Sequence, residues 1–565
     1  MEIAKELTVI AIDTETTNSN PHKASLLFYT TYDGQDPITV GTSNLGNNDT
    51  DGYIGHNLKY DAIVLKKNLN EDIVIVWDTY VAEYLLHIEL INDKKKHGLK
   101  LESILKRRYN IVKNDLIATY NKATGKDRKN LPDKWWEEVD RTALEAYGKG
   151  DVQYLFRLME DQKKELIDRG LYAWYVNVEI PIVNILVKSE LTGVKVDREH
   201  LLLLQKKYEE QVQFLEKNLK DIARSTTLNI NSTKQLQNVL FNVLHLPKTT
   251  RTKTGWSTDI KSLKPLRKKH LFVDRLLQYR EIQKILGTYV LPLLEASTET
   301  SRVNTTFNQC FTVTRRFSSE HPNIQNIPAN TAGKELRGCF VPETGKKFII
   351  ADYDQIELRL LAHLSKEEKL IKWFLDNVDI HAQTANIISK ALGRQLSRKD
   401  GKILNFSLLY GKTAYGLSKD WGISEAEAQR IISTYYAQFP AVKVWKDNNE
   451  LTVINNHGRL SSLAGLPLFV GDPMLTTTEW EYEQIMRLAN NYPIQSSSQD
   501  ILKRAIVNIY MKYNLVPVLM VHDELVYETD EAEKYMPLIK AEMESVFNLI
   551  VPLKTTIKIS DKWEK

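Results

Sequence analysis

The stretch VPVLMVHDELVYETD, residues 516–530, places three ionisable side chains between two apolar runs. The runs on either side predict the two strands of a buried β-hairpin. His522, Asp523 and Glu524 then lie in the middle of the hairpin. A buried carboxylate is costly unless it is paired or binds a metal. The hairpin therefore predicts that another carboxylate of the chain meets Asp523 in space.

A second apolar strand supplies that partner. The segment FIIADYDQIELR, residues 348–359, runs from a strand that ends in Asp352 into a helix that carries Glu357. If this strand lies beside the hairpin, Asp352 and Asp523 meet at one edge of a sheet. Two carboxylates placed in this way can bind two Mg²⁺ ions that also hold a triphosphate, which is the arrangement for phosphoryl transfer.

The stretch SRKDGKILNFSLLYGK, residues 397–412, predicts a helix with one functional face. Cations and then aromatic rings recur every four residues, so they share a stripe along the helix. Cations suit the phosphates of a nucleotide, and aromatic rings suit its sugar and base. Gly401 weakens the helix by about 1 kcal/mol relative to Ala. The stripe consists of Arg398, Lys402, Phe406 and Tyr410, and His381 is a further candidate phosphate contact.

Residues 1–175 contain a separate set of carboxylates. Short apolar strands alternate with helical stretches here and predict an α/β domain. Alternation places the two carboxylates of D-x-E on one face of the first strand. Two further carboxylates each follow a polar or aromatic residue at a spacing of four. Four carboxylates can hold two divalent cations about 4 Å apart, which clamp a phosphodiester and activate a water. The set comprises Asp13, Glu15, Asp61 (four after Asn57) and Asp151 (four after Tyr147, a candidate to hold the water).

Length and composition narrow the possible classes of protein. A chain of 565 residues is too long for one core and predicts several domains. The net charge is only +4, so binding to nucleic acid requires local basic patches. One such patch is the insert 248–269, which holds eight Lys or Arg residues and one Asp. Two cysteines without ligand spacing indicate a reducing compartment, and no run approaches the ~18 apolar residues of a membrane span. We therefore expect a cytoplasmic protein without a membrane partner.

The ordered motifs resemble those of the family A DNA polymerases, the group of bacterial DNA polymerase I and related phage enzymes. The amino-terminal set resembles the DEDD exonuclease superfamily, in the branch whose last motif carries Tyr. The polymerase motifs are TRRFSSEHPNIQNIP (314–328), ADYDQIELRLLAHLS (351–365), the helix 398–411, NNYPIQSSSQDILKRA (490–505) and VHDEL (521–525).

The resemblance implies a multidomain α/β and α architecture. An RNase H-like 3′→5′ exonuclease domain at residues 1–175 would precede a right-hand polymerase domain at residues 176–565. Because Asp13 lies so near the start, the resemblance also implies that no 5′-nuclease domain precedes it. Within the polymerase domain we expect a thumb at about 190–300, a palm at about 300–375 and 495–565, and fingers at about 376–494.

The resemblance implies template-directed addition of dNTPs to a primer 3′ end, with 3′→5′ proofreading, in phage or bacterial DNA replication. Each active site would bind two Mg²⁺ ions, with Mn²⁺ as a substitute. The implied exonuclease ligands are Asp13, Glu15, Asp61 and Asp151, with Tyr147 positioning the water. The implied polymerase ligands are Asp352, Asp523 and the carbonyl of Tyr353, with His522 and Glu524 supporting the primer end and the metal site.

The resemblance also assigns nucleotide and DNA contacts. Glu357 would reject a 2′-hydroxyl, and Phe406 would lie against the sugar and predict poor incorporation of dideoxynucleotides. The triphosphate would be held by Arg398, Lys402 (also a general acid on pyrophosphate) and His381, with Tyr410 near the template base. DNA would be contacted by Arg316, Asn323, Gln325, Asn326, Arg487, Asn491, Gln495 and His522, and by the insert 248–269 at the thumb tip.

Two departures from the family pattern concern primer-strand contacts, fidelity and strand displacement. Arg315 stands where many relatives have Gly, and residues 495–500 read QSSSQD where many have QGTAAD. Three other functions were weighed: a single-subunit RNA polymerase, an exonuclease joined to an inactive binding module, and a structural DNA clamp. The Glu357 gate and the intact carboxylate pairs argue against them. We expect a monomer that binds primer–template DNA and dNTPs; a processivity factor or helicase partner, and replication against repair, stay open.

Overall fold

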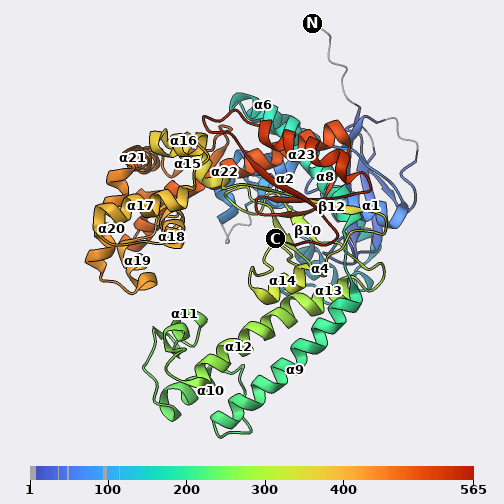
Figure 1. Ribbon diagram of the computed structural model, residues 1–565. Coiled ribbons are helices and arrows are strands. Elements are labelled where there is room, and N and C mark those ends of the chain that lie inside the picture. The colour runs from blue at the N-terminus through green and yellow to red at the C-terminus, as the bar shows by residue number, and fades with distance from the viewer. Residues whose placement is uncertain (1–7, 36, 47–49, 93–97, 114, 565) are drawn as a thin grey trace.

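The computed structural model describes residues 8–35, 37–46, 50–92, 98–113 and 115–564. Figure 1 shows a central body with an amino-terminal and a carboxyl-terminal sheet. An arm of long helices, drawn in green, projects from this body, and a group of helices drawn in orange projects from it in another direction (Figure 1). Among the described residues no single helix is long and apolar enough to cross a membrane, although the bent pair Arg141–Asp168 and Tyr172–Thr192 meets that test jointly.

The amino-terminal sheet has five strands in the order β3-β2-β1-β4-β5. Strand β1 is central, antiparallel to β2 and parallel to β4. The first strand, which carries Asp13 and Glu15, is confirmed as β1, whereas the sequence did not predict the antiparallel pair β2–β3. The strands are β1 (Val9–Thr16), β2 (Leu26–Tyr32), β3 (Thr39–Gly41), β4 (Gly52–Gly55) and β5 (Ile75–Asp78).

Helices flank this sheet and fix the ends of its strands. Thr30 of β2 donates a hydrogen bond to the carbonyl of Gly148 (3.2 Å). A Cβ at Gly148 would lie 3.1 Å from the side chains of Phe28 and Thr30, so glycine lets the helix approach the sheet closely. The helices are α1 (Lys59–Leu69), α2 (Thr79–Leu86), α3 (Leu101–Tyr109), α4 (Leu116–Thr124), α5 (Arg141–Val152) and α6 (Leu155–Asp168).

Helix α8 (Ile180–Thr192) joins the two halves of the body. It packs on α1 and β5 of the amino-terminal half and on β15 of the other half. The Asn184 side chain bonds to both backbone groups of Ile75, and Ser189 donates to the carbonyl of Pro517 (2.6 Å). Buried residues of both sheets consequently form one continuous hydrophobic core.

The arm has a hydrophobic core of its own, in which Leu219, Leu240 and Phe272 are fully buried. The basic insert 248–269 contains a short hairpin and a helical turn, and the cations of Lys248 and Arg251 lie 5.3 and 5.8 Å from the Trp256 ring. The arm consists of α9 (Arg198–Ile222), α10 (Thr233–Gln237), η4 (Asn238–Val243), β7 (Arg251–Thr252), β8 (Gly255–Trp256), α11 (Ile260–Leu263) and α12 (Leu271–Ile285), which continues into η6 (Leu286–Val290) and α13 (Leu291–Ala296).

The carboxyl-terminal sheet has four strands in the order β15-β16-β12-β17, all antiparallel. Strands β15 (Pro517–Val521) and β16 (Glu524–Thr529) form the predicted hairpin. Strand β12 (Lys347–Tyr353) lies beside β16 with Asp352 opposite Glu524. The expected neighbourhood of the two strands is thus confirmed. Helices α22 (Glu479–Tyr513) and α23 (Ala532–Ser545) and strand β17 (Thr555–Ser560) complete this half.

Residues 300–346 form short elements only, whereas residues 356–455 form a series of helices. The short elements are β9 (Arg302–Val303), β10 (Thr306–Asn308), β11 (Ser318–Glu320) and α14 (Thr331–Arg337). The helices are α15 (Ile356–Ser365), α16 (Glu368–Leu375), α17 (Ile380–Leu392), α18 (Arg398–Leu409), α19 (Ala414–Trp421), α20 (Glu425–Gln438) and α21 (Pro440–Asn455), followed by the hairpin of β13 (Arg459–Ser461) and β14 (Pro467–Phe469).

The structure explains why residue 401 is a glycine. Helix α18 begins with a capping box between Ser397 and Asp400, which offsets part of the low helix propensity of glycine. A Cβ at position 401 would lie 2.0 Å from the carbonyl oxygen of His381 on α17. Glycine therefore allows α17 and α18 to pack closely, which sets the distance between His381 and the stripe.

We predict that Gly401→Ala destabilises the protein by about 1–3 kcal/mol, because the added methyl forces α17 and α18 apart. The matched control is Gly287→Ala, where a Cβ meets nothing within 4 Å. The control should keep or raise the melting temperature, since Ala favours the helix. Calorimetry of both variants is the measurement. Equal melting temperatures for the two would contradict the packing argument.

Candidate active sites

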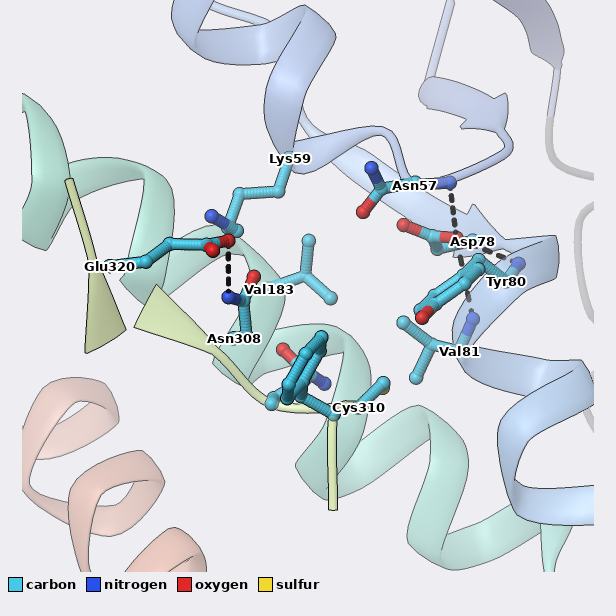
Figure 2. A pocket seen from close by; sticks show the side chains of 11 residues that line it. Asn57, Lys59, Asp78, Tyr80, Val81, Val183, Asn308, Cys310 and Glu320 are labelled. Carbon is cyan, nitrogen blue, oxygen red and sulfur yellow. Dashed lines mark hydrogen bonds between the residues drawn. The ribbon is translucent and has the colours of Figure 1, made fainter. Parts of the chain in front are cut away.

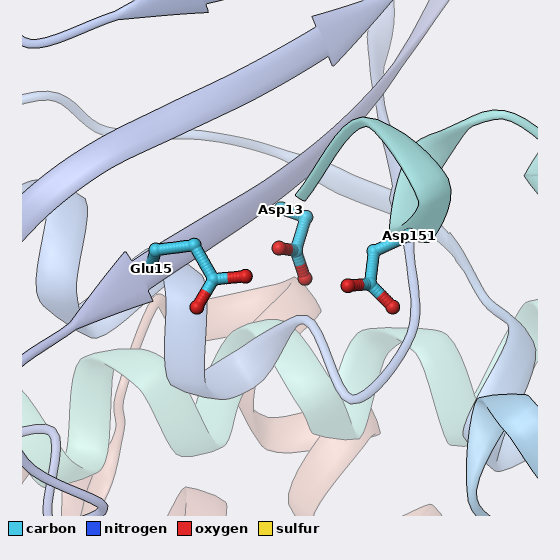
Figure 3. A group of neighbouring side chains, drawn as sticks. All are labelled: Asp13, Glu15 and Asp151. Atoms are coloured by element: carbon cyan, nitrogen blue, oxygen red, sulfur yellow. The ribbon is translucent and has the colours of Figure 1, made fainter. Parts of the chain in front are cut away.

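Three carboxylates converge beside the amino-terminal sheet. Asp13 and Glu15 come from β1, and Asp151 comes from α5, which packs across β1 and β2. Ligand oxygens of the three side chains all lie within 4.8 Å of one another. Figure 3 shows the three carboxylates pointing toward a common point. A donor set made only of carboxylate oxygens fits hard divalent cations such as Mg²⁺ or Mn²⁺.

Asp61, the fourth carboxylate predicted here, lies outside this group of three. Its Oδ1 accepts hydrogen bonds from the backbone N–H and the hydroxyl of Thr14, at 2.8 and 2.6 Å. It is close enough that its charge raises the pKa values of Asp13 and Glu15. The structure therefore brings three of the four carboxylates together and ties the fourth to the strand between them.

Burial and mutual repulsion dominate the electrostatics of this cluster. Burial, and then the charge of Asp151, raise the pKa of Asp13 and of Glu15 well above the usual range. Burial raises the pKa of Asp61 to about 7, against the hydrogen bonds from Thr14. It raises the pKa of Asp151 to about 6, against the nearby charge of Lys113. Such a set is stabilised by positive charge, which a divalent cation would supply.

Lys113 is a residue of this site that the sequence did not reveal. Its Nζ lies 2.9 Å from each carboxylate oxygen of Asp151 and 3.6 Å from the centre of the Tyr147 ring. No motif or spacing relates Lys113 to the other residues, because it lies in the connection between α3 and α4. Only the tertiary fold reveals its position.

The cluster opens into a cavity of about 440 Å³, whose lining includes Tyr147, His56 and Lys100. A second cavity of about 210 Å³ adjoins it, because Asn57 and Tyr80 line both. Figure 2 shows this second cavity between the two halves of the body. Its walls come from Asn57, Lys59, Asp78, Tyr80 and Val81 on one side and from Val183, Asn308, Gln309, Cys310, Phe311 and Glu320 on the other.

A second set of polar residues lies at the edge of the carboxyl-terminal sheet. Asp352 ends β12 opposite Glu524, and the backbone N–H of Tyr353 donates to the carbonyl of Asp523 (3.3 Å). The backbone of Asp352 and Tyr353 therefore lies beside that of Asp523, as the sequence predicted. Glu524 is buried, and its Oε1 accepts a hydrogen bond from the indole N–H of Trp563 (2.7 Å).

Glu357 connects three of the predicted motifs. One oxygen accepts a hydrogen bond from Arg316 (2.6 Å), and the other accepts one from the hydroxyl of Tyr410. Burial, followed by the charge of Glu357, raises the pKa of Tyr410, so this hydroxyl keeps its proton. Asn491 on α22 donates to the carbonyl of Tyr410 (3.2 Å). The carboxylate of Glu357 is thus fixed from two sides.

The stripe on α18 forms as predicted. The Phe406 and Tyr410 rings are stacked with centroids 6.4 Å apart, and Lys402 Nζ lies 6.0 Å from the centre of the Phe406 ring. Arg398 is exposed and pairs with Asp379. The His381 ring lies 5.7 Å from the Phe406 ring.

Asn405, which the sequence did not single out, orients His381. Its amide donates to Nδ1 of His381 (3.1 Å), and its carbonyl accepts from Thr384 (3.1 Å). Because Nδ1 is an acceptor, the neutral ring carries its proton on Nε2. Burial, followed by the charge of Arg398, lowers the pKa of His381, which favours the neutral ring, and the hydrogen bond from Asn405 selects its tautomer.

The remaining predicted DNA contacts lie in different environments. Gln325 is buried, and its amide donates to the carbonyl of Met520 (2.8 Å), so this side chain holds the hairpin. Asn323 accepts from the backbone N–H of Asn326 (3.2 Å). Arg487, Asn326 and His522 are exposed, whereas Gln495 is partly buried on α22.

Arg315, at the first departure from the family pattern, contacts Asp500, the unchanged last residue of the segment that holds the second departure. Arg315 has a φ of 56°, a left-handed conformation that favours the glycine of many relatives. Its side chain is fully buried, pairs with Asp500 (3.0 Å) and donates to the carbonyl of Pro467 (2.9 Å). Arg315 therefore stabilises the end of the segment 495–500 through buried contacts.

Comparisons with known proteins cover nearly the whole chain. The model of the 3′-5′ exonuclease family matches residues 1–167, and that of DNA polymerase family A matches residues 198–565. DNA polymerase I of Caldicellulosiruptor bescii is 40% identical over 72% of this chain and 49% of its own length. DNA polymerase I of Borreliella burgdorferi is 30% identical over 100% of this chain and 63% of its own length. The chain thus spans about half to two thirds of these relatives.

A solved structure has the same fold throughout. It is described as the POL domain of Pol1 from M. smegmatis in complex with DNA primer-template and dNTP. The TM-score is 0.83 at 25% sequence identity, over 99% of this chain and 96% of that one.

We predict that Mg²⁺ stabilises the protein more at pH 7.5 than at pH 5.5. The pKa values of Asp151 and Asp61, about 6 and about 7, exceed the ~3.9 of an unfolded chain. The metal-free folded state therefore binds more protons than the unfolded state between about pH 4 and 7, and its stability falls as pH rises through this window.

Calorimetry with EDTA or with Mg²⁺ at the two pH values is the measurement. In Asp13→Asn, which removes one of the repelling charges, the difference between the pH values should shrink. A rise in melting temperature that is equal at both pH values would contradict the prediction.

Proposed function

The chain belongs to DNA polymerase family A, with a 3′-5′ exonuclease domain ahead of its polymerase domain, and from this membership we propose that it copies a DNA template and removes nucleotides from the primer 3′ end. The observation that carries the proposal is the presence of two separate groups of acidic residues, one beside β1 of the amino-terminal sheet and one at the ends of β12 and β16 of the other sheet. Each suits two-metal phosphoryl chemistry. The enzyme would act on primer–template DNA with dNTPs, in the replication of bacterial or phage DNA in the cytoplasm.

At the polymerase centre, Asp352, Asp523 and the Tyr353 carbonyl would hold two Mg²⁺ ions. The ions would neutralise charge that develops on the phosphates and on the primer 3′ oxygen. The side chains of α18 would then bind the triphosphate, with Arg398 and Lys402 as cations. His381 would donate its Nε2 proton to a phosphate oxygen, because Asn405 occupies Nδ1.

Glu357 would act as the gate for the sugar. Its two oxygens are held by Arg316 and Tyr410, so the carboxylate cannot turn away from a 2′-hydroxyl. This rigidity favours dNTPs over rNTPs and supports a DNA polymerase over a single-subunit RNA polymerase. Phe406, stacked on Tyr410, would pack against the sugar near its 3′ position.

The contacts to DNA would be of two kinds. Arg316, Asn491, Gln495 and the neighbouring Arg487 would face the minor groove of the new base pair, where all correct pairs share acceptors. The arm, residues about 190–300, would be the thumb, and its basic insert would grip duplex phosphates without sequence preference. The carboxyl-terminal sheet would be the palm and the helices between α16 and α21 the fingers.

At the exonuclease centre, Asp13, Glu15 and Asp151 would hold the metal ions, with Asp61 beside them. Tyr147, which lines the same cavity, would orient the attacking water. The single strand would approach through the adjoining cavity of Figure 2. There the exposed ring of Phe311 offers a surface on which a base can stack.

We predict that the two activities separate by mutation. Asp352→Asn should lower primer extension by at least about a thousandfold, because metal charge stabilisation supplies several kcal/mol. It should leave shortening of the primer intact. Asp13→Asn should do the reverse. An end-labelled primer on a longer template, with and without dNTPs, reports both on one denaturing gel.

The test requires that each substitution abolish one activity and leave the other intact. Loss of both activities in either variant would point to a folding defect, which circular dichroism would reveal. Shortening without extension in the unchanged protein would leave an exonuclease and refute the polymerase assignment.

We predict that Phe406→Tyr raises the use of dideoxynucleotides relative to dNTPs by about tenfold. A tyrosine hydroxyl would stand where the missing 3′-hydroxyl leaves polar groups unpaired, and one hydrogen bond is worth about 1 kcal/mol or slightly more. Competition of ddNTP with dNTP in single-nucleotide extension measures the ratio. Phe406→Leu, which adds no hydroxyl, is the control and should show no gain.

A further inference from the structure

Lys113 introduces a fixed positive charge into the exonuclease centre. Its ammonium lies 2.9 Å from both oxygens of Asp151, so it covers the carboxylate as a bidentate partner. It also lies 3.6 Å from the centre of the Tyr147 ring, in the range of a cation–π contact. The side chains of Lys113 and Asp151 are each only 12% exposed. The ammonium is therefore held inside the site, away from bulk water.

The backbone around Asp151 leaves room for this lysine. Gly150 directly precedes the carboxylate, and a Cβ there would lie 3.2 Å from Cε of Lys113, with no other atom within 4 Å. Any larger residue at position 150 would thus crowd the lysine and little else. The approach of Lys113 to Asp151 is accommodated by the sequence of α5.

The charge acts on the whole cluster. Besides Asp151, its field lowers the pKa of Asp13 and of Glu15, against their burial. By contrast Lys100, which lines the same cavity, lies 3.7 Å from Glu102 and is half exposed. Lys113 is thus the lysine that occupies a cation position on Asp151.

A metal ion and this ammonium compete for the oxygens of Asp151. Oxygen ligands of Mg²⁺ lie at about 2.0–2.1 Å, and a divalent and a univalent cation about 4 Å apart repel by about 8 kcal/mol at an effective dielectric constant near 20. The side chain of lysine has a flexible stem, so it can leave Asp151 without a change of fold. A phosphate of the DNA 3′ end would be its alternative partner.

We propose that Lys113 is the tethered counter-ion of the exonuclease centre, occupying the cation position on Asp151 until a DNA 3′ end draws the ammonium away. The exchange breaks no covalent bond and leaves the proton on the lysine. It makes full metal loading depend on substrate, which restrains the exonuclease while no strand is present. This inference rests on the exonuclease activity proposed above, whereas the contact between Lys113 and Asp151 does not depend on that activity.

The test measures metal binding by the full chain without DNA. Mn²⁺ is titrated and followed by electron paramagnetic resonance, with Asp352→Asn and Asp523→Asn present to silence the polymerase centre. Lys113→Met should tighten Mn²⁺ binding at least about tenfold, because a competing charge is removed. Lys113→Arg, which keeps the charge, should bind Mn²⁺ less tightly than Lys113→Met. Lys100→Met is the matched control and should change the affinity less than about threefold.

Excision of a single-stranded oligonucleotide gives the second readout. For Lys113→Met the Mg²⁺ concentration at half-maximal rate should fall, while the rate at saturating Mg²⁺ stays within about threefold of the unchanged enzyme. Unchanged or weaker Mn²⁺ binding by Lys113→Met would overturn the proposal. A collapse of the excision rate at saturating Mg²⁺ and saturating oligonucleotide would also overturn it, since Lys113 would then be needed for the chemical step itself.

The two proposals fail in different ways. If no variant shortens DNA, the exonuclease function is refuted, whereas tighter Mn²⁺ binding by Lys113→Met would still support the counter-ion. If Lys113→Met does not fold, as judged by circular dichroism, Lys113→Gln replaces it with the same expected outcome.

Discussion

Repulsion between carboxylates that are held together is the constraint on which this structure depends. At the amino-terminal centre the acidic side chains come from a buried strand and two helices, and at the other centre they lie near the ends of β12 and β16, so water screens them poorly. The fold meets this cost locally and differently at each centre. At the amino-terminal cluster Thr14 satisfies Asp61 and Lys113 neutralises Asp151. At the carboxyl-terminal edge the indole of Trp563 binds Glu524. A carboxylate that one of these groups hydrogen-bonds or neutralises does not need a metal ion to offset its negative charge.

The two centres are held by one rigid joint. Glu179, directly before α8, pairs with Lys503 of α22 (2.8 Å), and both side chains are fully buried. Near the other end of α8, Glu190 accepts from Lys59 of α1 (2.5 Å) and from the backbone N–H of Phe307 (2.8 Å). Removing one partner of a buried pair leaves an uncompensated charge and costs about 3–5 kcal/mol. These pairs therefore oppose any sliding of one half against the other. They fix the distance between the two acidic centres.

Sequence reasoning succeeded where one segment carries its own signal. Apolar runs with breaks at charged residues predicted the β15–β16 hairpin, β12 and β1, and spacing by four predicted α18 with its stripe. It failed where a residue acquires its role from a distant part of the chain. Lys113 and Trp563 stand in no motif, and Asn405 lies in the helix motif 398–411 but off its predicted stripe. Nothing local marks the three residues as partners of Asp151, Glu524 and His381. Asp61 shows the same limit, because its sequence spacing could not show that Thr14 holds it beside the other three carboxylates. The pair β2–β3 was missed because its strands are short or carry polar threonines.

Arg315 shows how a departure from a family pattern can leave a site intact. A residue with a side chain in a left-handed conformation is strained relative to glycine, yet the guanidinium gains a buried partner in Asp500 and an acceptor in the Pro467 carbonyl. The strained backbone of Arg315 and its ion pair with Asp500 are both buried. The next residue, Arg316, still reaches Glu357 at 2.6 Å, and Glu357 still binds Tyr410. Arg315 therefore supports, through its buried contacts, the backbone that carries the neighbouring Arg316.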